Sequence, residues 1–268
     1  MTTASLVPDI TTSVAGRPAR RRLPGAEWIK LRSLRSTWIL LASVVVLFVV
    51  VPAFTAVGAV VQARSGTAAG EADAIAMVLT GVSPVEFLVA ALGALAVTGE
   101  YSSGLIRVTL AAVPRRVPVL VAKAAVIGAV TFATAMIAVP AAFLTVRLVL
   151  SSAGLVATGD AQAVVVSAMS AGAYLTGVAL IGIGFGWVLR STAGALAAFF
   201  GFMYIPPLLA MLPGAAGIAP FLPSNAGAVL LRAAVAEPMM AAIGALVFAA
   251  WVAALLAVAA LILRRRDA

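Results

Sequence analysis

The sequence predicts an all-α polytopic membrane protein with six transmembrane helices. Hydrophobic residues make up 63% of its 268 residues, charged residues only 10%, and the mean hydropathy is +1.16. Soluble domains are closer to half apolar and a quarter charged, so a globular core cannot absorb this excess. The apolar residues also gather in uncharged runs of about 20 residues or more, the length that crosses a bilayer.

The first 24 residues are predicted to form a disordered basic tail. They are polar and contain several prolines and a group of arginines: Pro8, Pro18, Pro24, Arg17, Arg20, Arg21 and Arg22. Such a composition cannot bury enough apolar surface to fold. The first apolar run is too late and too long for a signal peptide. Residues 25–268 are expected to form one transmembrane domain.

Residues 25–37, GAEWIKLRSLRST, predict a short helix in the headgroup layer ahead of the first span. Apolar residues recur every three or four positions among cations: Trp28, Leu31, Leu34 and Trp38 among Lys30, Arg32 and Arg35. Because Arg35 falls close to the apolar stripe, a second interpretation is that the first span begins early with basic anchors.

Five long apolar runs predict spans 1, 3, 4, 5 and 6, at residues 38–61, 122–146, 163–189, 193–212 and 241–263. Span 2 is less regular. Ser83-Pro84-Val85-Glu86 fits a capping box with proline at the first helical position, so Glu86 is predicted to cap the helix rather than to bind a substrate. Residues 74–82, also apolar, are expected to form an interfacial or re-entrant piece before it.

The stretch TGEYSSGLIRVTLAAVPRR, residues 98–116, predicts a short amphipathic surface helix between spans 2 and 3. Ser102 or Ser103 can cap it and Pro114 ends it. One side of the helix is expected to be apolar, with Arg107 pointing elsewhere; that side comprises Leu105, Ile106, Thr109, Ala112 and Val113.

Glu100 lies at the end of span 2, where a negative charge opposes the helix dipole. A cationic partner is therefore expected. The candidates are Lys30, Arg32 and Arg35 of the preceding helix, or a residue of another protein.

The segment between spans 5 and 6 remains apolar but contains five prolines, which break helices: Pro206, Pro207, Pro213, Pro220 and Pro223. Non-helical backbone at membrane depth needs protein or water around it. Residues 213–235 are interpreted either as a broken, partly re-entrant outer element or as an ordinary folded loop.

The lysines and arginines predict the orientation. Fifteen of the 18 fall on one side of the predicted topology, and only Arg64, Arg147 and Arg232 fall on the other. The positive-inside rule then places both termini in the cytoplasm. It also accounts for the net charge of +9 without a nucleic-acid partner.

The composition excludes several kinds of chemistry. The chain has no cysteine and no histidine, so thiolate and imidazole metal sites and histidine-dependent catalysis are excluded. Its only lysines, Lys30 and Lys123, follow no phosphate-binding glycine loop. We therefore expect no catalytic residue, cofactor or metal. Because the predicted spans contain acids only at their ends, the energy for transport is expected to come from outside the chain.

Glycines recur along span 4, and Gly182 and Gly186 have GxxxG spacing. Small residues let helix backbones approach closely. Packing within one subunit is the expected use of this face, and a contact between subunits is the alternative.

Three stretches resemble one family: EWIKLRSLRSTW at residues 27–38, the stretch at 98–116, and LPSNAG at 222–227. They are similar to actinobacterial ABC transporter permeases of the type-2 exporter class. The resemblance implies a six-span permease of the cell membrane. It also implies a second permease subunit, as a homo- or heterodimer, and two separate ATPase subunits that bind ATP and Mg. Members have an interfacial helix before span 1, a coupling helix between spans 2 and 3 and a re-entrant element between spans 5 and 6.

By this resemblance, the ATPase stroke reaches the membrane domain through residues 104–113, including Gly104 and Arg107, and Glu100 takes part in the coupling. A hydrophobic or amphipathic substrate then leaves past Pro220, Pro223 and Asn225. Two other classes of function compete: a non-transporting immunity or scaffold protein, and an ion-coupled secondary transporter.

Overall fold

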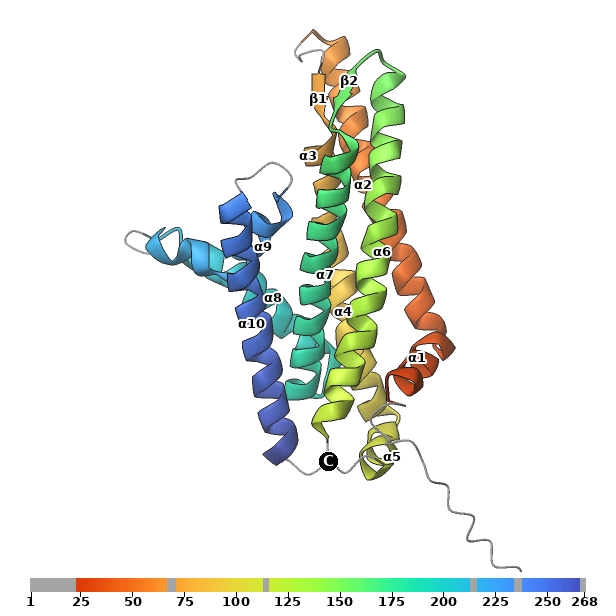
Figure 1. Cartoon of the computed structure of the whole chain (residues 1–268), viewed down its shortest axis with the longest axis vertical. Coiled ribbons are helices and arrows are strands. Elements are labelled where there is room, and N and C mark those ends of the chain that lie inside the picture. Colours follow the sequence, from red (N-terminus) through yellow and green to blue (C-terminus); the bar gives the residue numbers. More distant parts are fainter. Residues whose placement is uncertain (1–22, 67–70, 113–115, 213–215, 234–237, 266–268) are drawn as a thin grey trace, which may run out of the picture.

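A computed structural model of the protein describes residues 23–66, 71–112, 116–212, 216–233 and 238–265 (Figure 1). Within these ranges, six helical segments are long and apolar enough to cross a membrane, as the sequence predicts. They are α2 (Arg35–Arg64), α3 with α4 (Ala74–Leu79 and Val82–Ser102), α6 (Val117–Ser151), α7 (Ala161–Leu189), α8 (Thr192–Leu209) and α10 (Pro238–Arg265). The chain is a multi-pass, almost entirely helical membrane protein.

Shorter elements connect these spans. They are α1 (Leu23–Ser33), β1 (Glu71–Asp73), α5 (Leu105–Ala112), β2 (Val156–Thr158), the 3-10 helix η2 (Ala216–Phe221) and α9 (Pro223–Leu231). The predicted tail at residues 1–24 lies outside the described residues up to position 22, and α1 already includes Leu23 and Pro24. The helix predicted over 25–37 ends at Ser33, so Arg35 belongs to the first turn of α2.

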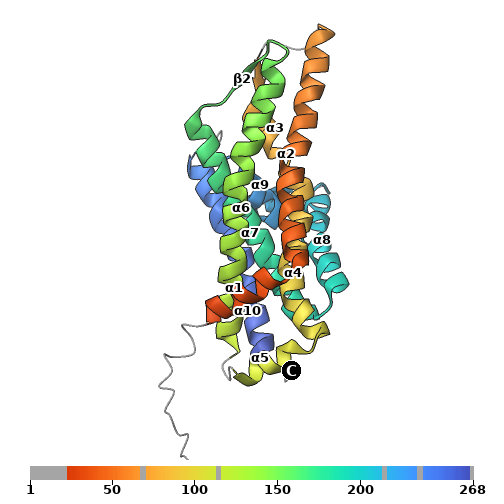
Figure 2. The ribbon, with the colours of Figure 1, turned by 90° about the vertical axis from the view of Figure 1, so that its right-hand side faces the viewer.

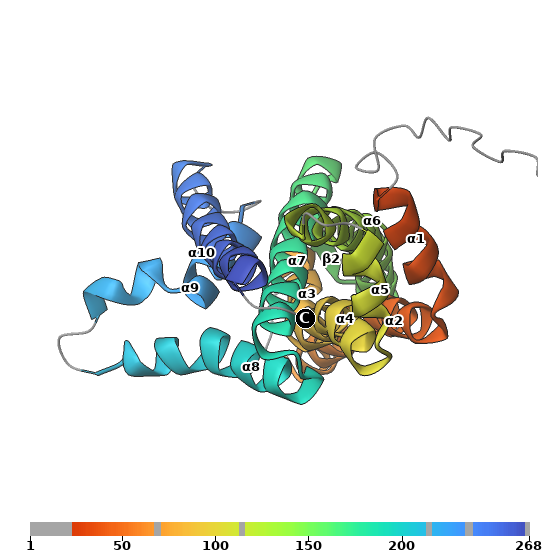
Figure 3. The ribbon, with the colours of Figure 1, turned by 90° about the horizontal axis from the view of Figure 1, so that it is seen from below.

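The helices α4 and α7 lie at the centre, with α2 and α6 on one side and α10 on the other (Figures 1 and 2). The helices α1 and α5 lie toward the end of the bundle where α10 finishes, and we call this the α5 end. The two short strands lie at the opposite end. Seen from the α5 end, α8 leans away from the other spans (Figure 3).

The strand pair β1–β2 is an element that the sequence did not predict. The two strands are parallel, with Glu71 opposite Val156 and Asp73 opposite Thr158. Three residues per strand are too few to show an alternating pattern. The pair joins the connection before α3 to the connection before α7. Asp73, the last residue of β1, caps α3, and Asp160, two residues after β2, caps α7.

The predicted capping role of Glu86 is wrong. Helix α4 begins at Val82, after Gly81, and its start has no side-chain cap. It continues the direction of α3 closely enough for the two to form one 29-residue span. Glu86 therefore lies in the interior of a span and is 6% exposed.

The short helix predicted between spans 2 and 3 is present as α5, but its start differs from the prediction. The hydroxyls of Ser102 and Ser103 both donate to the Gly99 carbonyl at the end of α4, and neither accepts a hydrogen bond from a described residue of α5. The chain turns instead at Gly104, whose φ of +74° favours glycine because a side chain would be strained there. Ile106 is buried, whereas Leu105, expected on the same apolar side, is 53% exposed. Val113 lies outside the described residues.

Where it is described, the segment between spans 5 and 6 consists of the 3-10 helix η2 followed, after Leu222, by the helix α9. Residues 213–215 and 234–237 of this segment lie outside the described ranges. Pro223 opens α9 at a helix-start position and is buried, whereas Pro220 is exposed in η2. The Asn225 side-chain amide donates to the Ala219 carbonyl over 2.8 Å and ties α9 to η2. Re-entry into the membrane stays a prediction.

Glycines bring α4 and α7 into backbone contact. A Cβ at Gly182 would lie 2.2 Å from the Ala90 carbonyl oxygen, and one at Gly93 would lie 2.1 Å from the Ala179 oxygen. A Cβ at Gly186 would lie 3.1 Å from Val97. The GxxxG face of span 4 therefore packs within the subunit, as expected.

Replacing Gly182 by alanine tests this contact. Gly182→Ala is expected to lower the free energy of unfolding by about 1–3 kcal/mol, because the added methyl meets backbone that cannot move aside. Thermal unfolding of the detergent-solubilised protein measures the loss. Gly58→Ala is the matched control, since a Cβ at this helical position meets nothing within 4 Å. Equal effects of the two substitutions would show that the α4–α7 contact is not close.

Candidate functional site

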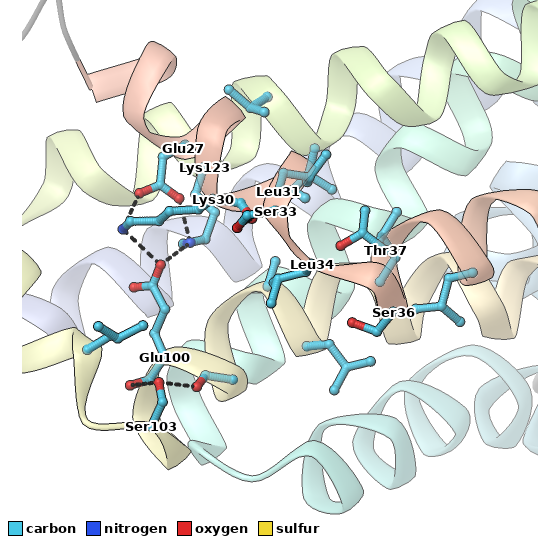
Figure 4. Close-up of a pocket in the computed structure, with 18 residues that line it drawn as sticks. Glu27, Lys30, Leu31, Ser33, Leu34, Ser36, Thr37, Glu100, Ser103 and Lys123 are labelled. Carbon is cyan, nitrogen blue, oxygen red and sulfur yellow. Dashed lines mark hydrogen bonds and ion pairs between the residues drawn. The ribbon is translucent and has the colours of Figure 1, made fainter.

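Two lysines and two glutamates converge where α1 crosses α4 and α6 (Figure 4). Lys123 Nζ lies 2.6 Å from Glu27 Oε2 and 2.8 Å from Glu100 Oε1. Lys30 Nζ lies 2.8 Å from Glu27 Oε1 and 3.0 Å from the same Glu100 oxygen. We call these four residues the ion cluster. It joins three helices that are far apart in the sequence.

The position of each residue on its helix places its side chain in the ion cluster. Glu27 and Lys30 are three residues apart on α1, so they lie on one side of the helix. Glu100 falls in the last turn of α4 on its buried side. Lys123 falls in the second turn of α6, on the side that faces α1.

The ion cluster is buried and electrically neutral. The side chains of Lys123, Glu27 and Glu100 are 4%, 5% and 9% exposed, and only that of Lys30, at 35%, reaches the surface. Removing ions from water costs several kcal/mol each, about as much as a well-placed opposite charge returns. The cluster therefore fixes which helices meet more than it adds net stability.

The pKa values of the α1 charges reflect this balance. Burial alone would raise the pKa of Glu27, but Lys123 and Lys30 outweigh burial and hold the pKa below its ordinary 4.5. Burial alone would lower the pKa of Lys30, but its hydrogen bonds to Glu27 and Glu100 raise the pKa above 10.5. Both groups are therefore charged at neutral pH.

The ion cluster also reaches α5. Lys30 Nζ donates to the Thr109 hydroxyl over 3.3 Å, so one ammonium group contacts residues of α1, α4 and α5. Gly104 forms the turn between α4 and α5. Arg107 is exposed on α5 and forms no ion pair with any residue that the structure describes. Its charge is thus available to another molecule.

A cavity of about 320 Å³ opens beside the ion cluster (Figure 4). The charged residues and Ser103 line one part of it, and apolar side chains such as Leu40, Leu92 and Val126 line the rest. The arrangement contains no nucleophile paired with a base. The ion pairs of the arrangement hold α1, α4 and α6 together.

The other residues predicted for the α1 region are at the surface. Arg32, Arg35 and Trp28 are exposed, and Lys30 is the one predicted cation that pairs with Glu100 in the described part of the chain. The indole N–H of Trp38 donates to the Arg32 carbonyl over 3.1 Å and links α1 to the start of α2.

Sequence reasoning missed Glu27 and Lys123 as members of the site. Both left a signal. Glu27 stands one turn from Lys30, which permits an ion pair on a helix. Lys123 is an isolated charge within an apolar run, and such a charge needs a partner.

A second polar cluster, also missed, lies within the spans. Glu86 of α4 accepts hydrogen bonds from the Tyr174 hydroxyl of α7 and from the Tyr204 hydroxyl of α8. The expectation that acids lie only at span ends is therefore wrong. It failed because the start of span 2 was placed at Pro84, which left Glu86 in the first turn of a short helix.

Comparisons with known protein families and with curated proteins find no match to the chain. No group of three or more acidic residues able to hold a metal ion is found in the described ranges. The family resemblance therefore rests on the three sequence stretches quoted above.

Replacing Lys123 by methionine tests the ion cluster. Lys123→Met is expected to lower the free energy of unfolding by about 3–5 kcal/mol, because two buried carboxylates would share one partly exposed lysine. Thermal unfolding in detergent measures the effect, and adding Glu27→Gln should restore part of the loss. Arg35→Met, at an exposed cation nearby, is the control. Equal melting temperatures for Lys123→Met and Arg35→Met would contradict the structural role.

The attachment of α1 is also expected to depend on pH. Its stabilisation by Glu27 is present above pH 4.5 and is lost as the pH falls through the lower pKa of the folded state. Stabilisation by Lys30 is present below pH 10.5 and is lost as the pH rises through its raised pKa. The protection factors of the α1 amides, which correct hydrogen exchange for its intrinsic dependence on pH, should therefore fall at both extremes. In Glu27→Gln the acid-side change should shrink; an unchanged acid limb would refute the assignment to Glu27.

Proposed function

We propose that the protein is the membrane-spanning permease subunit of an ATP-driven exporter, with the α5 end in the cytoplasm. One observation carries the proposal: a buried ion cluster joins α1, the end of α4 and the start of α6 directly beside the exposed helix α5. In an ATP-driven exporter, a membrane subunit without a nucleotide-binding motif needs a surface that receives movement from a separate ATPase. These elements are suited to that task.

In the proposed mechanism, α5 is the coupling helix and Arg107 is its contact to a carboxylate of the ATPase. A displacement of α5 acts on α4 through the turn at Gly104. It acts on α1 and α6 through Glu100 and its two lysine partners. Charges fixed by short ion pairs move together, so the stroke reaches three helices at once.

The remaining parts of the proposal follow the sequence. The ATPase dimer binds ATP and Mg. The bilayer contacts α1 at exposed residues such as Trp28. A second permease subunit completes the translocation path. The substrate, hydrophobic or amphipathic, leaves past Pro220, Pro223 and Asn225.

The buried Glu86 favours a second candidate, an ion-coupled secondary transporter, because an acid within a span is a common site for a coupling ion. Transport that survives ATP depletion but stops with an ionophore would favour this candidate. A third candidate, an immunity or scaffold protein, would purify from native membranes without any ATPase.

The direct experiment is purification of the tagged chain from its native membrane, followed by identification of any co-purifying ATPase. The complex in lipid should hydrolyse ATP faster when a transported ligand is added. Recovery of the chain without an ATPase, together with no ATP-dependent transport in vesicles, would refute the proposal.

Arg107 gives the sharpest test of coupling. Glu100→Ala removes a carboxylate that pairs with two lysines, so a loss of transport in this variant could come from lost stability as well as from lost coupling. Arg107→Ala changes an exposed side chain instead. Arg107→Ala is expected to insert and melt normally but to reduce ATPase co-purification or transport at least several-fold. The control is Arg147→Ala, an exposed arginine at the opposite end of the bundle. Unchanged transport and co-purification in Arg107→Ala would eliminate the contact.

A further inference from the structure

Glu86 is a buried acid whose partners are neutral. Its two oxygens accept hydrogen bonds from Tyr174 and Tyr204, one oxygen each. No lysine or arginine forms an ion pair with it among the described residues. This sets it apart from Glu27 and Glu100, whose charges are cancelled by lysines.

A carboxylate in this position is suited to attract a cation. Hydrogen bonds from two phenols satisfy lone pairs but supply no positive charge. An isolated negative charge away from water is costly, so the carboxylate binds a proton unless another cation reaches it, and it attracts that cation more strongly than it would in solvent. Acids within membrane spans are accordingly functional sites by default.

The surroundings of Glu86 indicate what kind of cation fits. The Tyr204 ring stacks on Phe87, with centroids 5.5 Å apart, and on Phe200, with centroids 5.1 Å apart. Phe87 and Phe200 are 36% and 51% exposed, so their rings extend from the buried acid to the surface of α4 and α8. Aromatic faces attract organic cations.

Other cations fit less well. A hard metal ion such as Ca²⁺ takes about 6–8 oxygen ligands, and one carboxylate among phenol groups and apolar rings does not supply them. A proton would bind the carboxylate alone and make no use of the exposed rings. A bulky, delocalised organic cation uses both, and the helix that carries two of the rings, α8, leans away from the bundle (Figure 3).

We propose that Glu86, Tyr204, Phe87 and Phe200 form a binding site for a lipophilic organic cation. The binding itself needs no ATPase. The further conclusion, that such cations are the transported substrates, rests on the proposed exporter function. The cation enters from the membrane side of α4 and α8, places its charge toward Glu86 and packs its apolar groups on the rings.

The test uses the purified chain in lipid nanodiscs and radiolabelled tetraphenylphosphonium as the probe. Equilibrium dialysis should show saturable binding that Glu86→Gln weakens at least tenfold. Triphenylphosphine oxide, a neutral compound of similar shape, should bind the native protein and Glu86→Gln equally. The matched control is Glu71→Gln, which changes an exposed acid in β1, at the end of the bundle opposite the α5 end. It should leave binding unchanged.

Further variants separate charge from packing. Glu86→Asp keeps the charge and should retain more binding than Glu86→Gln. Phe200→Leu changes an exposed ring and should weaken binding several-fold, while Leu208→Ala, on the same helix, should not. Because Phe200 is exposed, this variant keeps the test decisive even if Glu86→Gln fails to fold.

Two outcomes would overturn the site: no saturable binding to the native protein, or equal binding to native, Glu86→Gln and Phe200→Leu proteins. Failure of the exporter proposal would appear elsewhere, as absence of ATP-dependent transport by a chain that still binds the cation. Conversely, ATP-driven transport without cation binding would reject only the site.

Discussion

The fixed constraint at the α5 end is the burial of Lys123. An ammonium group that is 4% exposed within a transmembrane helix needs negative charge within hydrogen-bond reach. Glu27 and Glu100 supply it, and their excess charge in turn requires Lys30. The position of α1 against α6, and of both against the end of α4, satisfies this requirement.

A different constraint holds the centre of the bundle. At Gly93 and Gly182 the backbones of α4 and α7 are so close that a methyl group would meet a carbonyl oxygen. Contacts of this kind allow little sliding, so α4 and α7 are expected to move as one body. The ion cluster and α5 lie at one end of that body and Glu86 lies along its length. A displacement at α5 and a change of occupancy at Glu86 thus act on the same pair of helices, which gives the proposed coupling a physical route.

The spans were predictable because the bilayer imposes a local rule on length and polarity, and each apolar run satisfies it without reference to the others. Their ends were not. At 1.5 Å per residue, α6 is about 52 Å long, well beyond a hydrocarbon core of ~30 Å. Its outer turns include Arg147 and rest on neighbouring helices, so hydropathy gives no sign of them. The start of span 2 was misplaced for a different reason, because Ser83 and Pro84 fit a helix start, and Glu86 was misplaced with it.

The sequence by itself determined the number of spans, the short helix after Gly104 and the need of Glu100 for a cation, because each depends on residues within a few turns of one another. Only the tertiary structure decided which charges meet. Glu27 and Lys123 are 96 residues apart, and Glu86 and Tyr204 are 118 apart. A local sequence pattern predicts that a side chain needs a partner of a given charge. The identity of that partner depends on how close-packed helices are placed, which is a property of the whole bundle.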